Sequence, residues 1–133
     1  MYRIVKTFHF CYGHRLMGHP GKCSRAHGHN AVLEVELAGE DLDERGMICD
    51  FADVKRRIEE IVDGRLDHRM ILEVHDPLVA ALRSAGEEPF VLDVPPTAEN
   101  IARLIFREAR AMDLPVAAVR LWETPTSRAE YSE

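Results

Sequence analysis

Three histidines carry the clearest chemical signal in this sequence. The stretch CSRAHGHN places His27 and His29 two residues apart, so in an extended chain both imidazoles project from the same side. His14 follows an alternating apolar segment, and we expect a hairpin to bring it to the same end as His27. Three neutral imidazoles leave one position of a tetrahedral zinc ion open, which is typical of a catalytic site. The sequence therefore predicts a zinc cofactor held by His14, His27 and His29.

The same residues allow less specific interpretations. A single histidine in a loop is more often a satisfied polar residue than a ligand, although that is a poorer explanation for three that converge. Cys23 lies four residues before His27, and as a fourth ligand it would close the site and give it a structural role. The spacing leaves open this alternative of one cysteine and three histidines. Three further histidines have no partner at ligand spacing and are interpreted as ordinary strand or loop residues: His9, His19 and His75.

Alternating apolar and polar residues predict the strands that hold the histidines. Residues 2–10 and 31–39 alternate in this way and are expected to pair antiparallel through the loop at 15–26. Strands are also predicted at 89–94 and 116–123, with short segments at 46–50 and 129–133 as further candidates. Helical spacing predicts a helix capped by Asp50, a short one capped by Asp76 and a long one capped by Thr97.

These elements predict an α+β fold and a single domain over residues 1–133. An antiparallel four-stranded sheet is expected to carry two main helices on one face. With 46% hydrophobic residues, the chain can bury a core of its own, and it has no apolar run long enough to span a membrane.

Charge and cysteine content exclude several classes of partner. A formal charge of −6 argues against a polynucleotide, whose phosphates require a basic face. The three cysteines are an odd number without close spacing, so free thiols in a reducing compartment are expected. The N-terminus has no secretory or lipidation signature. We therefore expect a cytoplasmic protein with neither a membrane nor a nucleic acid as partner.

Beyond the histidines, short motifs follow one another in a recognisable order. HRL, GKC, HGHN, DF, LDH, PTAEN and a late WET span nearly the whole chain. In this order they resemble the family of 6-pyruvoyl-tetrahydropterin and 6-carboxytetrahydropterin synthases. The resemblance implies the tunnelling fold, in which sheets of several subunits join into a barrel, commonly a homohexamer with active sites between subunits. The unpaired edges of so small a sheet favour assembly independently of the resemblance.

The resemblance also implies a substrate, 7,8-dihydroneopterin triphosphate. Its side-chain hydroxyls would bind the zinc held by the three histidines, and the metal would ease proton removal from them. Glu123 aligns with the residue that anchors the pterin, because a carboxylate can accept two parallel N–H bonds from the pterin edge. Thr124 would assist in binding the substrate.

Three further residues would carry the proton transfers. Cys23 aligns with the catalytic cysteine, which acts as general base in its thiolate form. Asp67 and His68 resemble the pair that completes the proton relay. Neighbouring residues in an extended chain point to opposite faces, so Asp67 can orient His68 only if the backbone turns there or another residue intervenes. The alternative interpretation of Asp67 and His68 is that they lie at an exposed helix end.

Binding of the triphosphate needs positive charge. The candidates are Arg15, Lys22, Arg25 and Arg69.

Two reactions compete within this family. One eliminates triphosphate and rearranges the product to 6-pyruvoyltetrahydropterin. The other releases acetaldehyde and triphosphate to give 6-carboxy-5,6,7,8-tetrahydropterin on the route to queuosine and other 7-deazapurines. The compact loop between Cys23 and His27 looks more like the carboxytetrahydropterin synthases.

Outside these activities, the alternatives are a non-catalytic zinc protein and a metal-dependent hydrolase unrelated to pterins. The sequence departs from the usual family pattern where Cys11, Tyr12 and Gly13 replace small residues.

Overall fold

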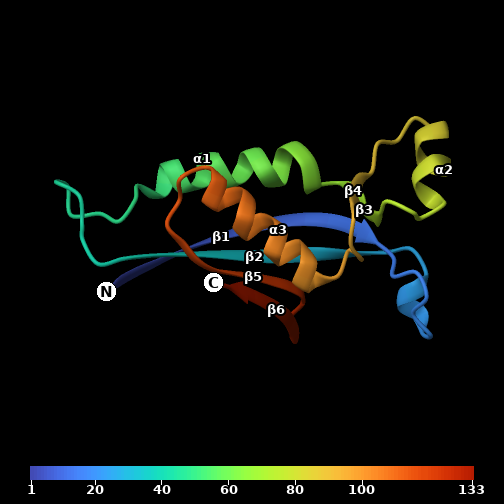
Figure 1. Cartoon of the computed structure of the whole chain (residues 1–133), viewed down its shortest axis with the longest axis horizontal. Helices are drawn as coiled ribbons and strands as arrows, with labels where there is room; N and C mark the ends of the chain where they lie inside the picture. Colours follow the sequence, from blue (N-terminus) through green and yellow to red (C-terminus); the bar gives the residue numbers. More distant parts are fainter.

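A computed structural model describes all residues of the chain, 1–133. The strands are β1 (Tyr2–His14), β2 (His27–Gly39), β3 (Arg69–Glu73), β4 (Phe90–Leu92), β5 (Val116–Thr124) and β6 (Ser127–Ser132). The helices are α1 (Phe51–Ile61), α2 (Leu78–Ser84) and α3 (Ala98–Ala111), with the short turns η1 (Lys22–Ser24) and η2 (Val62–Leu66). All strands join one sheet in the order β4-β3-β1-β2-β5-β6, and α1 and α3 lie on one side of it (Figure 1). None of the helices combines the length and apolar character that crossing a bilayer requires.

The predicted antiparallel hairpin is confirmed and is longer than expected. β1 and β2 pair along their whole length, from Tyr2 opposite Gly39 to His14 opposite His27. The polar residues next to the loop at 15–26 continue the ladder, because their backbone groups pair as well as those of the apolar residues do. The histidines are therefore strand residues at the end of the hairpin.

The prediction of a four-stranded antiparallel sheet is wrong in both number and direction. The sheet has six strands and is mixed, because β3 pairs parallel to β1 and β4 pairs parallel to β3. The five residues of β3 are separated from the end of η2 by two residues, and so short a strand gives no periodic signal of its own. The strand expected at 46–50 does not form, since the Asp43 carboxylate accepts the N–H groups of Arg45 and Met47 and makes a turn.

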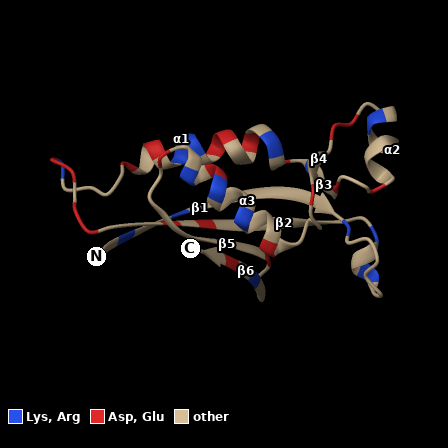
Figure 2. Ribbon diagram, viewed as in Figure 1, with Lys and Arg blue, Asp and Glu red and all other residues tan.

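Two of the three predicted helix starts are confirmed by their caps, whereas α2 begins at Leu78 with Pro77 in the N-cap position that was predicted for Asp76. The Asp50 carboxylate accepts the N–H of Ala52 at 2.8 Å, and the Thr97 hydroxyl accepts the N–H of Asn100 at 3.2 Å. Basic and acidic residues follow one another along α1, as the blue and red segments of the ribbon in Figure 2 show. At its C-terminal end α1 continues into η2, a π-helical turn, and this turn places residues 67 and 68 beside β1.

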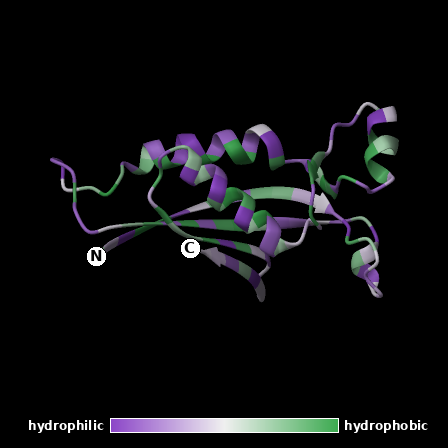
Figure 3. Cartoon of the chain, viewed as in Figure 1, coloured by the Kyte–Doolittle hydropathy of each residue, from purple (hydrophilic) through white to green (hydrophobic).

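One face of the sheet packs against α1 and α3 and forms the core. Hydrophobic residues alternate with hydrophilic ones along both helices (Figure 3), and their apolar sides meet the sheet at fully buried residues: Leu33, Val35, Leu37, Val54, Ile58, Ile101 and Ile105. Each such side chain contributes about 1.5–3 kcal/mol to stability. We call this side the helix-covered face and the opposite side the helix-free face. Along β1, Phe10, Tyr12 and His14 are buried on the helix-covered face, and His9 and Cys11 alternate with them.

Candidate metal centre and active site

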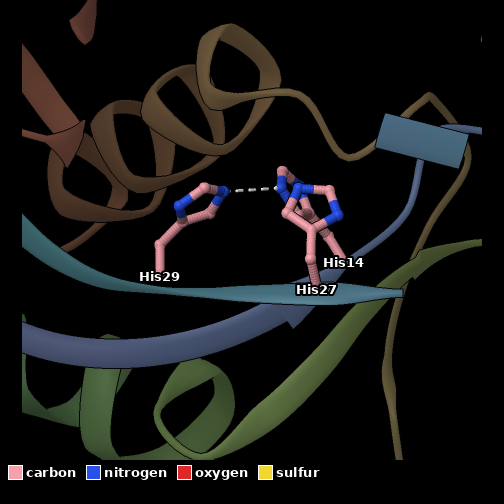
Figure 4. Close-up of side chains that lie close together, drawn as sticks. All are labelled: His14, His27 and His29. Carbon is pink, nitrogen blue, oxygen red and sulfur yellow. Dashed lines mark hydrogen bonds between the residues drawn. The ribbon is translucent and has the colours of Figure 1, made fainter. Parts of the chain in front are cut away.

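The register of the hairpin brings the three predicted metal ligands together. His14 lies directly opposite His27, and His29 lies opposite Tyr12, so all three imidazoles project from the helix-covered face at one end of the sheet. Figure 4 shows the three rings gathered above β1 and β2. Their ring centroids are 4.5, 5.1 and 5.1 Å apart, and one ligand atom from each lies within 4.8 Å of the others. This cluster can hold a metal ion, as the sequence predicted.

Backbone carbonyl groups fix the orientation of two of the imidazoles. Nδ1 of His14 lies 2.7 Å from the carbonyl oxygen of Pro96, and Nδ1 of His27 lies 2.7 Å from that of Arg25. A carbonyl oxygen only accepts, so each Nδ1 carries the proton and each Nε2 is left as the metal ligand. Burial lowers the pKa of His14, which keeps this imidazole in the neutral form that binds metals. The donor set thus fits a transition metal of the zinc type.

A cavity of about 360 Å³ opens beside the histidines. It is lined by the three imidazoles together with Cys23, Glu99, Glu123 and Arg128. Cys23 therefore shares the cavity, but it is not a member of the cluster whose ligand atoms all lie within 4.8 Å. This arrangement favours an open metal site with a thiol at its side over the closed site of one cysteine and three histidines.

Glu123 reaches the cavity from β5, which pairs antiparallel with β2. Its two carboxylate oxygens lie 3.7 Å from Nε2 of His14 and 3.7 Å from Nε2 of His29. The phenol of Tyr12 donates a hydrogen bond of 2.8 Å to one of them. Tyr12 was not among the predicted site residues. Its position two residues before His14 on the same strand was the available signal.

Asp67 and His68 form a pair at the start of β3. The backbone of His68 is left-handed, with φ of +59°, and this turn lets its Nδ1 approach Oδ2 of Asp67 to 2.8 Å. The other oxygen of Asp67 accepts the N–H of Cys11 at 3.0 Å. Although partial burial raises it, these contacts hold the pKa of Asp67 below its ordinary value. The backbone turn that Asp67 needs in order to orient His68 is therefore present.

The structure of one chain does not bring this pair to Cys23. Asp67 and His68 line a hollow of about 450 Å³ with His9 and Cys11, which alternate with the buried side chains of β1. Cys23 lines the cavity on the helix-covered face. The three residues predicted to carry the proton transfers thus divide between the two faces of one sheet.

The remaining candidates have different partners in the structure. Thr124 is exposed and does not line the cavity, and its hydroxyl accepts the N–H of Thr126 at 3.3 Å. Arg15 is bound to the Asp76 carboxylate. Several basic residues lie along the segment between β1 and β2 that contains η1, coloured blue in Figure 2. Arg128 lines the cavity and was missed, because it is brought there only by the pairing of β6 with β5.

Comparison with known proteins gives consistent matches over the whole chain. A protein from Haemophilus influenzae named 6-carboxy-5,6,7,8-tetrahydropterin synthase is 37% identical over 142 aligned residues that cover all of both chains. One of the same name from Aquifex aeolicus is 32% identical and covers 99% of this chain and 98% of its own.

Solved structures agree with the sequence matches. The Caenorhabditis elegans 6-pyruvoyl tetrahydropterin synthase superposes with a TM-score of 0.75 at 25% identity, covering 99% of this chain and 95% of its own. An uncharacterised protein from Wolinella succinogenes gives 0.79 at 29% identity, covering 99% and 98%. The family model described as 6-pyruvoyl tetrahydropterin synthase matches residues 3–133. The chain therefore belongs to the 6-pyruvoyl tetrahydropterin synthase family.

Proposed function

We propose that this protein is a 6-carboxy-5,6,7,8-tetrahydropterin synthase. It is a lyase that converts 7,8-dihydroneopterin triphosphate to 6-carboxytetrahydropterin with loss of acetaldehyde and triphosphate. The observation that carries the proposal is the full-length similarity to proteins of that name. The histidine cluster, the thiol and the carboxylate that line one cavity support it, because they supply the groups that this chemistry needs.

We assign zinc to the cluster of His14, His27 and His29. Three neutral imidazoles suit zinc and leave room for substrate oxygens, as in other catalytic zinc sites. When bound there, the metal supplies Lewis acidity that lowers the pKa of coordinated substrate hydroxyls. The protein's own contribution is to fix the imidazoles, and the carbonyls of Arg25 and Pro96 do so through Nδ1.

Cys23 and Glu123 have complementary roles in this proposal. The Cys23 thiolate accepts a proton from the side-chain carbon of the substrate, since it lines the same cavity as the histidines. The Glu123 carboxylate accepts N–H bonds from the 2-amino-4-oxo edge of the pterin and fixes the ring. Tyr12 holds one oxygen of Glu123, so the carboxylate is oriented before the substrate arrives.

A second copy of the chain supplies the rest of the proton relay. Asp67 and His68 lie on the other face of the sheet from Cys23, so the pair serves the cavity of a neighbouring copy. The sheet has an edge suited to such assembly: β1 pairs with β3 only from Tyr12 to His14, which leaves residues 2–10 without a neighbour on that side. Unpaired edges favour pairing with another copy. We propose a homohexamer, as the family resemblance implies, in the cytoplasm, where its three free cysteines stay reduced.

The decisive experiment is to incubate the zinc-loaded protein with 7,8-dihydroneopterin triphosphate. Products are identified by mass spectrometry, and acetaldehyde is assayed separately, with the Cys23→Ala variant as control. Carboxytetrahydropterin together with acetaldehyde is the expected result. Pyruvoyltetrahydropterin without acetaldehyde would replace the proposal with the sister activity. Unreacted substrate in the presence of bound zinc would favour a non-catalytic zinc protein.

A further inference from the structure

A second cluster of metal-binding side chains lies on the helix-free face and shares no residue with the cluster of three histidines. It consists of Cys11 on β1 and the pair Asp67 and His68 before β3, and one ligand atom from each lies within 4.8 Å of the others. Sulfur, oxygen and nitrogen donors are thus gathered in one place. None of the motifs that indicated the family includes Cys11.

Backbone hydrogen bonds hold this cluster together. The N–H of His68 donates to the carbonyl of Cys11 at 2.8 Å, and the N–H of Cys11 donates to Oδ1 of Asp67 at 3.0 Å. The left-handed backbone of His68 turns its ring back toward Asp67. Segments 56 residues apart in the sequence are therefore fixed in register. A cation would find the ligands already positioned, which reduces the ordering that binding requires.

In one copy of the chain the cluster is open to solvent and has room for a cation. Together with His9 and Asn30 its residues line a hollow of about 450 Å³, and the side chain of His68 is 80% exposed. His9 lies two residues before Cys11 on the same strand, so it offers a further imidazole on the same face. An incoming ion therefore has direct access to the cluster in a single copy of the chain.

We infer that Cys11, Asp67 and His68 form a second site, for a thiophilic divalent cation of the zinc class. Thiolate, carboxylate and imidazole are the side chains that bind zinc, whereas magnesium and calcium take oxygen ligands alone. The site has only three protein ligands on an exposed surface. The cluster of His14, His27 and His29 is more buried, so we expect it to fill first.

Occupation of the second site has a consequence for turnover, and this part of the inference rests on the proposed function. Asp67 and His68 are the proposed proton relay. A cation bound to their oxygen and nitrogen atoms occupies the lone pairs that would otherwise accept the proton. Metal beyond the first equivalent is therefore expected to inhibit the enzyme.

Cobalt(II) titration of the full chain, first stripped of metal with a chelator, tests the binding directly. A thiolate bound to cobalt produces a near-ultraviolet charge-transfer band, whereas three imidazoles do not. We expect the first equivalent to bind without this band and the second to bring it. Cys11→Ser should lose the band and the second equivalent but keep the first, which also reports that the variant is folded. Cys23→Ser and Cys49→Ser, matched changes at the other two thiols, should keep both.

Three outcomes would overturn the second site. They are binding of a single equivalent, survival of the thiolate band in Cys11→Ser, and loss of the band in Cys23→Ser. The last would place the thiolate beside the three histidines. None of these readings depends on catalysis, so failure of the proposed function leaves them unaffected.

The inhibitory consequence is tested separately with zinc and the turnover assay. Wild type should lose activity as zinc exceeds one equivalent, and Cys11→Ser should resist this loss. The activity of each protein at one equivalent of zinc serves as its own reference, so only the fractional loss above one equivalent is compared. Equal inhibition of both proteins would show that excess zinc acts elsewhere, and the inhibitory role would be rejected.

Discussion

The phenol of Tyr12 on β1 donates a 2.8 Å hydrogen bond to Oε1 of Glu123 on β5, with β2 between the two strands and a separation of 111 residues in the sequence. Tyr12 is buried, and burial together with the charge of Glu123 raises the pKa of its phenol above the ordinary value. The phenol therefore stays protonated and can only remain a donor to the carboxylate. Since Oε1 of Glu123 also lies 3.7 Å from Nε2 of His14, this hydrogen bond fixes the carboxylate between the metal ligands and the cavity.

Removing this hydrogen bond should weaken pterin binding without removing the metal. In Tyr12→Phe the ring still fills its place in the core, but Glu123 loses its donor and can turn toward the histidines. A hydrogen bond to a charged group contributes about 1.5–3 kcal/mol, so we expect roughly a tenfold or greater rise in the KM for the pterin substrate. Tyr131→Phe is the control, because Tyr131 bonds the terminal Glu133 away from the site. An unchanged KM in Tyr12→Phe would show that Glu123 needs no positioning.

Replacing the carboxylate itself should have a larger effect. Glu123→Gln keeps the size of the side chain but offers only one acceptor oxygen, so the paired N–H groups of the pterin cannot both be bound. We expect the dissociation constant of a pterin ligand, measured by calorimetry, to rise roughly tenfold to a hundredfold. Metal content should be unchanged. Glu99→Gln alters another carboxylate that lines the cavity and should have a much smaller effect.

The histidine cluster could be predicted because its geometry is local. Two residues of spacing on one strand and one hairpin determine where the three side chains lie, and both features are visible in the sequence. The helix caps at Asp50 and Thr97 were predictable for the same reason, since each acts within three residues. Family motifs then added Cys23 and Glu123, which line the cavity as expected.

Features that depend on distant pairing were not predictable. The contact of Tyr12 with Glu123 requires β5 to lie beside β2, and the hairpin alone does not reveal that neighbour. The five-residue strand β3 was missed, and its parallel pairing with β1 places Asp67 and His68 next to Cys11. Short parallel strands lack both a turn signal and a clear period, so only the assembled sheet shows which face they serve.

Loss of the Cys23 thiol should slow turnover strongly but leave the metal bound. In Cys23→Ala the three imidazoles and Glu123 are intact, and only the proposed base is missing. General bases contribute roughly a hundredfold to ten-thousandfold to rate, so kcat should fall by about that factor. Zinc content is measured by elemental analysis, and Cys49→Ala is the matched control. If zinc is lost along with the Cys23 thiol, the closed site of one cysteine and three histidines is the better explanation.

The ion pair between Arg15 and Asp76, next to the end of β1, should make the protein less stable as the pH falls into the acid range. Asp76 is 3% exposed, and it accepts hydrogen bonds from Arg15 and from the N–H of Leu78. The Arg15 guanidinium holds the pKa of Asp76 below its ordinary value. A carboxyl with a lowered folded-state pKa stabilises the protein above its unfolded pKa of about 3.9, and this contribution is lost as pH falls through the folded-state pKa.

Asp76→Asn should therefore cost about 1–3 kcal/mol near neutral pH, and the difference from wild type should shrink in acid. Urea unfolding at a series of pH values measures this difference. Glu87→Gln removes an exposed carboxylate and should leave the free energy of unfolding nearly unchanged. A difference for Asp76→Asn that stays constant into acid would show that the charge of Asp76 contributes nothing.

Shared active sites predict that two inactive variants restore activity when they assemble together. Cys23→Ala lacks the base and His68→Ala lacks the relay, so each alone should be inactive. A site built from two copies needs an intact thiol from one and an intact imidazole from the other. Random assembly of equal amounts gives about a quarter of the sites both groups, and activity should recover to about that fraction. Cys23→Ala assembled with the double variant Cys23→Ala/His68→Ala has no intact thiol and should stay inactive. If the two single variants also stay inactive together, Cys23 and His68 do not act across a subunit boundary.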